Sequence, residues 1–148
     1  MMHPSTKLRY GLRAMVDISI QPRGRPVLVH AIAERQDVSK KYLDQLLAQL
    51  RGAGLVRSIR GSRGGYLLAR PPEEITVQEI AAALDGAPTL VECVGDPSAC
   101  ARSEFCIAYE FWKDLSELIS EKMRKTTLAE LARRDGEKRS AGSSMYYI

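Results

Sequence analysis

The chain has 148 residues, of which 45% are hydrophobic and 27% are charged, a composition typical of a globular protein with its own core. No apolar stretch approaches the roughly 20 residues that a membrane-spanning helix needs, and the N-terminus has no signal-peptide pattern, so we expect a cytoplasmic protein without membrane contact. No nucleophile–base pair, catalytic carboxylate pair or nucleotide motif is visible, so we do not expect an enzyme.

The net charge of +4 is distributed unevenly along the chain. Residues 1–70 carry 13 Lys and Arg against 4 Asp and Glu, whereas residues 71–148 carry 9 against 14. A basic N-terminal half is typical of a head that binds a polyanion, although a solvated charged surface has the same composition.

The first predicted element is an amphipathic helix over residues 5–20. Ser5 is a suitable N-cap, and a segment with two prolines and a glycine follows the helix. The apolar face does not include Arg9, Arg13 or Asp17. That face contains Leu8, Leu12, Met15, Ile18 and, beside them, Ser19.

Two further helices are predicted over residues 28–36 and about 39–51, separated by a polar break. Residues 27–29 form either a short strand or the entry to the first of these helices, in which Leu28, Ala31 and Ile32 are expected to point inward. Ser39 or Asp37 caps the second helix. The pair predicts a helix-turn-helix, although helical hairpins are common in all-α proteins.

A basic hairpin follows, with strands predicted over residues 55–59 and 65–69. Its turn is Arg60-Gly61-Ser62-Arg63-Gly64, which lacks the Walker pattern of a nucleotide site. A basic hairpin directly after a helix-turn-helix is the winged-helix arrangement. In that arrangement the second helix offers polar side chains to the major groove, and the hairpin tip reaches phosphates or the minor groove.

From these two elements we expect seven residues to contact DNA. Gln45 is expected to pair with an adenine edge and the two adjacent lysines to contact phosphates, whereas Tyr42 is equally a packing residue. The full set is Ser39, Lys40, Lys41, Tyr42, Gln45, Arg60 and Arg63.

The C-terminal half is predicted to be helical. A capping box at Thr76 and Glu79 begins one helix, and a helix of about 18 residues begins at Phe105, which is longer than the average helix of a globular protein. The face of this long helix is too apolar for water, so it packs within its own domain or, as we expect, against a second copy. Another capping box at Thr127 begins a short helix, and the tail from Gly136 is expected to be disordered. The apolar face contains Ala108, Phe111, Trp112, Leu115, Leu118, Ile119, Lys122 and Met123.

All three cysteines of the chain, Cys93, Cys100 and Cys106, lie within 14 residues. Gly95, Asp96, Pro97 and Ser98 predict a turn-rich loop here rather than a helix. Such a loop can bring three thiolates to one point, as a soft metal or an iron–sulfur cluster requires. The alternatives are buried apolar cysteines, a zinc site and metal-free thiol redox sensing.

Together these segments resemble the IscR/NsrR-type winged-helix repressor family of bacteria over about residues 5–134. The resemblance is carried by residues 7–15, 32–36, 39–43 and 112–115, by the cysteine spacing and, most specifically, by the string GLVRSIRGSRGGYLL over residues 54–68. It implies a homodimer that pairs through the long helix and binds palindromic sites in double-stranded promoter DNA.

The resemblance also implies a cofactor. Several members of this family carry a [2Fe–2S] or [4Fe–4S] cluster on three cysteines spaced as here, and we favour [2Fe–2S] on Cys93, Cys100 and Cys106. In some relatives a histidine three residues after the last cysteine completes the cluster, and Tyr109 stands at that position in this chain. The candidates for the fourth ligand therefore stay open: Tyr109, Glu104, Glu110, His30 of the partner subunit or a small exogenous thiol.

The predicted fold is mainly α with a small β-hairpin wing. It comprises a winged helix-turn-helix DNA-binding domain over residues 1–88, a cluster-binding loop over 89–106, the dimerisation helix and terminal helix over 107–135, and a tail over 136–148. The predicted function is a transcriptional repressor that senses iron–sulfur cluster status and controls cluster-assembly or related genes. The alternative is a regulator of the same fold that responds to thiol redox state, nitric oxide or cysteine metabolism without a stable cluster.

Overall fold

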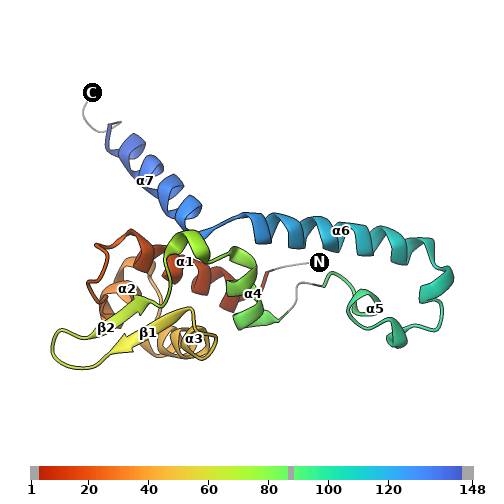
Figure 1. The fold of residues 1–148 in the computed structure, drawn as a ribbon, viewed down its shortest axis with the longest axis horizontal. Coiled ribbons are helices and arrows are strands. Elements are labelled where there is room, and N and C mark those ends of the chain that lie inside the picture. Colours follow the sequence, from red (N-terminus) through yellow and green to blue (C-terminus); the bar gives the residue numbers. More distant parts are fainter. Residues whose placement is uncertain (1–3, 87–88, 145–148) are drawn as a thin grey trace.

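The computed structural model describes residues 4–86 and 89–144, and it is mainly helical with one two-stranded antiparallel hairpin. Figure 1 shows a head built from the first four helices and the hairpin, from which α6 extends as an arm. The elements are α1 (Thr6–Ile20), α2 (Val29–Gln36), α3 (Lys40–Gly52), β1 (Val56–Ile59), β2 (Gly65–Leu68), η1 (Pro72–Glu74), α4 (Val77–Asp85), α5 (Glu92–Gly95), η2 (Pro97–Ala99), η3 (Ser103–Phe105), α6 (Ile107–Lys125) and α7 (Leu128–Ser144).

The head is held together by one apolar core to which all four of its helices contribute. Helix α3 supplies four leucines at three- and four-residue spacing, and all four are buried. Each fully buried leucine contributes about 1.5–3 kcal/mol of transfer free energy, so the spacing of α3 fixes which of its faces stays outside. The largest buried side chains of the core include Met15, Ile32, Leu43, Leu46, Leu47, Leu50, Leu55, Ile75 and Ile80.

The connection between α2 and α3 is the tight turn of a helix-turn-helix. Asp37 ends α2 in the left-handed conformation with φ 52°, and its N–H donates to the carbonyls of Ala33 and Glu34. Ser39 then caps α3, since its hydroxyl oxygen accepts a hydrogen bond from the N–H of Tyr42. Of the two predicted caps, the structure therefore uses Ser39.

The hairpin forms a wing, and a short strand-like segment pairs with the free side of its second strand. Strand β1 pairs with β2 in a register that sets Val56 opposite Leu68 and Ile59 opposite Gly65. Val27 adds an isolated bridge to Tyr66 on the other side of β2, so residue 27 is strand-like and the helix begins two residues later. The expectation that Leu28 points inward was wrong: Val27 is 7% exposed and Leu28 is 53% exposed, because the bridge turns the neighbouring side chains to opposite sides.

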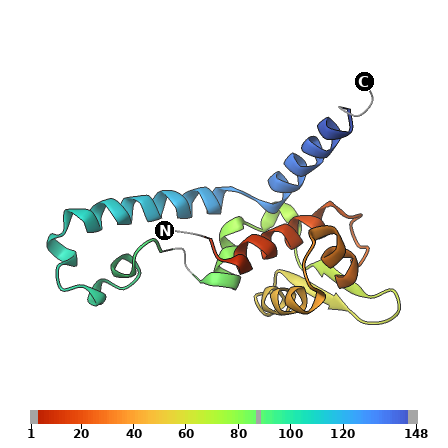
Figure 2. The same cartoon turned by 180° about the vertical axis from the view of Figure 1, so that it is seen from behind.

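The segment after α6 returns to the head. The N–H of Val77 donates to Thr126 O at 2.9 Å, and the N–H of Leu128 donates to Ile75 O at 2.8 Å. Leu128 is fully buried in the head core, although it lies forty residues beyond the predicted end of the DNA-binding domain. Both ends of α6 are thus connected to the head, one directly and one through the cysteine segment, residues 89–106 (Figure 2).

Helix α7 is longer than the sequence predicted. It continues to Ser144, so the expected disorder from Gly136 is wrong for residues 136–144, whereas residues 145–148 lie outside the described part of the chain. Ion pairs one turn apart support the extension, such as Arg133 with Glu137 and Asp135 with Arg139. Apolar periodicity does not detect such a helix.

None of the helices in residues 4–86 and 89–144 is long and apolar enough to cross a membrane.

Candidate DNA interface and cysteine segment

The exposed face of α3 carries polar side chains near its N-terminal end. Lys41 and Gln45 are exposed, one turn apart, and Lys41 has no ion-pair partner within the described residues. Lys40 is exposed but its Nζ lies 2.8 Å from Asp44 Oδ2 on the next turn. An exposed pair of this kind contributes only about 0.3–0.5 kcal/mol, so a phosphate can compete for Lys40.

Two of the predicted DNA contacts also have structural roles. The hydroxyl of Ser39 caps α3, so its oxygen is already engaged with the N–H of Tyr42 at 3.2 Å. The ring of Tyr42 is half-buried and lies edge-on to Tyr10 of α1, with centroids 6.2 Å apart and planes at 87°. Tyr42 therefore packs α3 against α1, which is the alternative that the sequence left open.

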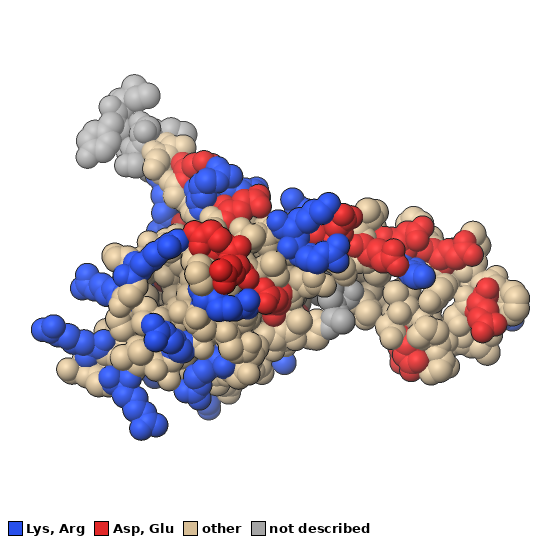
Figure 3. Space-filling view, viewed as in Figure 1, with Lys and Arg blue, Asp and Glu red and all other residues tan. Residues whose placement is uncertain are grey.

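The wing tip presents two arginines to solvent. Arg60 and Arg63 are exposed, and within residues 4–86 and 89–144 neither has an ion-pair partner. Figure 3 shows Lys and Arg side chains projecting from the head at the wing end, whereas Asp and Glu predominate along the outer half of α6. The charge asymmetry of the sequence is thus a spatial one, and it places positive charge where α3 and the wing are exposed.

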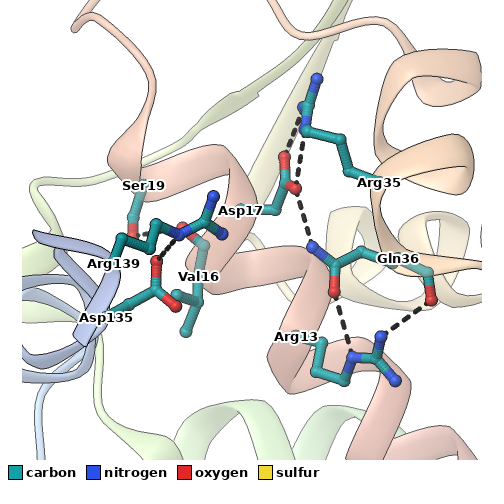
Figure 4. Close-up of polar contacts among 8 residues, drawn as sticks. All are labelled: Arg13, Val16, Asp17, Ser19, Arg35, Gln36, Asp135 and Arg139. Carbon is teal, nitrogen blue, oxygen red and sulfur yellow. Dashed lines mark hydrogen bonds and ion pairs between the residues drawn. The ribbon is translucent and has the colours of Figure 1, made fainter. Parts of the chain in front are cut away.

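Sequence reasoning missed a buried polar cluster behind the helix-turn-helix. Asp17 was placed off the apolar face of α1, but it is only 1% exposed and accepts hydrogen bonds from Arg35 and Gln36 (Figure 4). The hydrogen bonds from Arg35 to Asp17 raise the pKa of Arg35 above its ordinary value, so the guanidinium stays charged. Two features of the sequence could have indicated this cluster. Asp17 directly precedes Ile18 of the apolar face, and the next helix ends in Arg35 and Gln36.

The cysteine segment consists of short helical turns instead of the loop that the sequence predicted. Cys93 lies in α5, Cys100 follows η2, and Cys106 precedes α6 as its N-cap residue; all three thiols are free and half-buried. The turns form because the segment makes its own local hydrogen bonds. Those from the hydroxyl and the N–H of Ser98 lower the pKa of Asp96, and Ser103 Oγ donates to Pro97 O at 3.0 Å.

The cysteine segment offers a suitable donor set for a cluster but not an assembled site. Among the described residues no three Cys, His, Asp or Glu side chains are gathered as a metal site. Three thiols in one partly exposed segment match the ligand chemistry of iron–sulfur clusters. Tyr109 is half-buried in the first turn of α6, and its N–H donates to Cys106 O at 3.0 Å. Glu104 and Glu110 are exposed nearby in sequence, whereas His30 lies on α2 in the head.

A helix-turn-helix followed by a basic hairpin defines a winged-helix protein of the DNA-binding type. The chain belongs to the Rrf2 family, described as iron-dependent transcriptional regulators, whose pattern matches residues 4–134. This confirms the resemblance found in the sequence, and it makes the chain a transcriptional regulator of a DNA-binding family and not an enzyme.

Individual relatives agree with this assignment. The regulator IscR of Erwinia tasmaniensis is 40% identical over 130 residues, which cover 88% of this chain and 78% of the relative. The solved structure of T. potens IscR is 37% identical with a TM-score of 0.78, and the match covers 99% of this chain and 97% of that one. The solved structure of CymR of B. subtilis, described as the global cysteine regulator, is 36% identical with a TM-score of 0.77. The match covers 90% of this chain and 98% of that one.

Proposed function

We propose that this protein is a homodimeric transcriptional repressor that senses iron–sulfur cluster status and controls cluster-assembly or related genes. The observation that carries the proposal is the position of the three cysteines. All of them lie in the segment that joins α4, the last helix of the head, to α6. Ligand binding there acts on the connection between the DNA-binding head and the arm, and a ligand shifts a conformational equilibrium by its differential affinity for the two states.

For DNA binding, α3 and the wing contact different parts of the duplex. Gln45 reads a base edge in the major groove, and Lys40 and Lys41 contact phosphates beside it. Arg60 and Arg63 reach the backbone or the minor groove from the wing tip. Ser39 and Tyr42 complete the predicted interface from the first turn of α3, where they also cap and pack the helix.

For pairing, the apolar face of α6 supports a homodimer. Phe111 is 60% exposed and Leu118 is 63% exposed in the single chain, and Ser116 is the one residue of α6 that is buried. Exposed apolar surface of this kind marks an interaction site. Two copies paired through α6 would present two α3 helices to the two halves of a palindromic promoter site.

For sensing, Cys93, Cys100 and Cys106 would hold the cluster, and we favour [2Fe–2S] over [4Fe–4S]. When bound, the cluster would supply a redox-active and labile group in the cysteine segment. The chain's own contribution would be three thiolates, carried on short turns, that hold the cluster. Tyr109, Glu104, Glu110 and the partner subunit's His30 are the protein candidates for the fourth ligand, and a small exogenous thiol is the alternative.

A second candidate function rests on the likeness to CymR, described as the global cysteine regulator. In this alternative the chain responds to cysteine metabolism, nitric oxide or thiol oxidation without a stable cluster. The favouring observation is that the three free thiols are not gathered as a metal site in the described part of the chain.

The deciding experiment is anaerobic reconstitution of the full chain with ferrous iron and sulfide. We expect visible absorption with stoichiometric iron and sulfide, and its loss in Cys93→Ala, Cys100→Ala and Cys106→Ala. Ala101→Gly is the matched control, because Ala101 is exposed in the same segment and neither alanine nor glycine offers a side-chain ligand atom. Tyr109→Phe, measured in the same series, tests whether the phenol oxygen is the fourth ligand.

DNA affinity is then measured with and without the cluster, on duplexes selected by the protein from a random library. A change in affinity that the three cysteine variants abolish supports cluster sensing. A protein that stays colourless, but whose DNA affinity changes when its thiols are oxidised, supports the second candidate instead.

A further inference from the structure

The turn of the helix-turn-helix is held on both sides by one helix, α1. Arg13 and Asp17 lie one turn apart on α1, and the hydrogen bonds of both lead to the C-terminal end of α2 (Figure 4). Tyr10, which Arg13 contacts on the same helix, packs against the first turn of α3. Neither Arg13 nor Asp17 belongs to the exposed face of α3 or to the wing.

Before the turn, Asp17 fixes the end of α2. Its carboxylate accepts hydrogen bonds from Arg35 Nε at 2.9 Å and Arg35 Nη2 at 2.5 Å, and Gln36 Nε2 donates to it at 2.8 Å. The two oxygens thus hold Arg35 in a bidentate arrangement that permits little rotation, and one of them also accepts a single hydrogen bond from Gln36. Asp17 is the one charged side chain that is buried among residues 4–86 and 89–144.

Arg13 holds the same end of α2 from the exposed side. Its Nη2 donates to the backbone carbonyl of Gln36 at 2.8 Å, and its Nε donates to Gln36 Oε1 at 3.0 Å. The carbonyl belongs to the last residue of α2, where carbonyls have no partner within the helix. Gln36 is therefore fixed by its side chain and by its backbone, and Asp37 begins the turn directly after it.

After the turn, another residue of α1, Tyr10, contacts α3, and Arg13 lies against the Tyr10 ring. The guanidinium of Arg13 lies 4.9 Å from the centroid of the Tyr10 ring, within the range of a cation–π interaction. Tyr10 in turn packs edge-on against Tyr42, which lies between Lys41 and Gln45 in the sequence of α3. Helix α1 thus contacts both sides of the turn, α2 through Arg13 and Asp17, and α3 through Tyr10, against whose ring Arg13 lies.

We propose that Arg13 and Asp17 are positioning residues that set the angle at which α3 is presented to DNA. The inference rests on the proposed function only in taking α3 as the element that reads bases. Base recognition depends on hydrogen-bond directions, whereas attraction to phosphates depends mainly on net charge. A change in the angle of α3 therefore weakens binding to a selected sequence more than binding to DNA in general.

The first test compares Arg13→Ala with Arg9→Ala. Arg9 is a matched control because it is exposed on the same helix, and within the described residues its side chain hydrogen-bonds only to Thr6 Oγ1, at 3.3 Å. The probes are a duplex selected from a random library by the wild-type protein and a shuffled duplex of equal length. We expect Arg13→Ala to raise the Kd for the selected duplex about tenfold relative to Arg9→Ala, with equal Kd values for the shuffled duplex.

The salt dependence separates positioning from a direct phosphate contact. The slope of log K against log salt is negative, and loss of one phosphate contact lowers its magnitude by about 0.9 for B-form DNA. We expect that decrease in Arg60→Ala, which serves as the reference, and an unchanged slope in Arg13→Ala. An Arg13→Ala variant with a reduced slope and equal losses on both duplexes would show a phosphate contact and overturn the positioning role.

Two further variants separate this inference from the proposed function. Asp17→Asn keeps the shape of the side chain but sets an amide against Gln36 Nε2, so we expect the same selective loss on the selected duplex; unchanged selectivity in both Asp17→Asn and Arg13→Ala overturns the inference. Gln45→Ala reports on α3 itself. If Gln45→Ala and Lys41→Ala both leave the selected duplex unaffected, the use of α3 as the reading element fails independently.

Discussion

At the scale of single residues, Gly65 makes the wing possible. Its φ is +139°, and a Cβ at this position would overlap the backbone carbonyl of Val27. Val27 is the residue that pairs with Tyr66 of β2 in an isolated bridge. The absence of a side chain thus permits both the backbone conformation and the close approach.

We expect Gly65→Ala to destabilise the protein by about 1–3 kcal/mol, because the new methyl group meets backbone and the conformation is strained. Thermal unfolding measures this effect. Gly52→Ala is the control, since Gly52 is the last residue of α3 and has open space around it, and it should be neutral or stabilising by up to about 1 kcal/mol. Equal melting temperatures for Gly65→Ala and wild type would contradict the role of Gly65.

Residue type and spacing were enough to propose the exposed part of the candidate site. Arginines in a glycine-rich turn and cysteines in a polar segment indicated their chemistry without any structure, and the structure places both groups at least partly in solvent. Asp17 was beyond such reasoning, because helical periodicity assigns a charged side chain to the outer face. Its burial depends on partners that another helix supplies.

At the scale of elements, the start of α4 combines a capping box with an ion pair. Thr76 Oγ1 accepts from the N–H of Glu79, Glu79 Oε2 accepts from the N–H of Thr76, and Arg70 donates to Glu79 Oε1 at 2.7 Å. Burial alone would raise the pKa of Glu79, but the hydrogen bonds from Thr76 and Arg70 outweigh it and lower that pKa.

Because the pKa of Glu79 is lowered by folding, its carboxylate stabilises the protein at pH values above the ordinary glutamate pKa. This contribution is lost as the pH falls through the lowered value. We expect Glu79→Gln to cost about 1 kcal/mol or less at neutral pH, since water screens a pair whose side chains are 39% and 40% exposed. Denaturant titrations at several pH values measure the difference, which should vanish in acid; a difference that persists there would contradict this account.

Elements with a strong apolar periodicity or a capping box could be predicted from the sequence, whereas single turns and stretches supported by charged pairs could not. The leucine spacing of α3 gave bounds within a residue or two of the observed ones, and the capping box gave the start of α4. The last part of α7 has little apolar periodicity and is supported by charged pairs, and α5 is a single turn. Propensity over such short or polar stretches is too weak to decide the conformation.

At the scale of the whole molecule, the α6 arm is where a second copy would bind. We expect Leu118→Glu to shift a homodimer towards monomers, because it sets a charge at a contact that two-fold symmetry repeats. Loss of both leucine contacts, at about 1.5–3 kcal/mol each, would raise the dimer dissociation constant at least about 100-fold. Light scattering after gel filtration measures the mass.

Lys113→Glu is the control for the dimer prediction. Lys113 is exposed on the same helix but outside the predicted apolar face, so the mass of this variant should equal that of wild type. If Leu118→Glu also keeps the wild-type mass, α6 does not pair two copies through this face.

The path by which α6 returns to the head was invisible in the sequence. It depends on a bridge between Thr76 and Thr127 and on the burial of Leu128, and nothing local in either segment predicts that they meet. A linear division of the chain after residue 88 separates Leu128 from the core that it completes. A fragment ending there would expose that core, so the head is best studied in the full chain.

The chain has a single tryptophan, Trp112, and it lies on α6, half-buried and 5.1 Å from the ring of Phe111. It follows Cys106 by six residues, and the head contains no other indole. Its intrinsic fluorescence therefore reports on the arm alone, without any label. Quenching of this emission by a chromophore at the cysteines, and its recovery when the chromophore is lost, would give a continuous optical signal of the arm while DNA binding is followed separately.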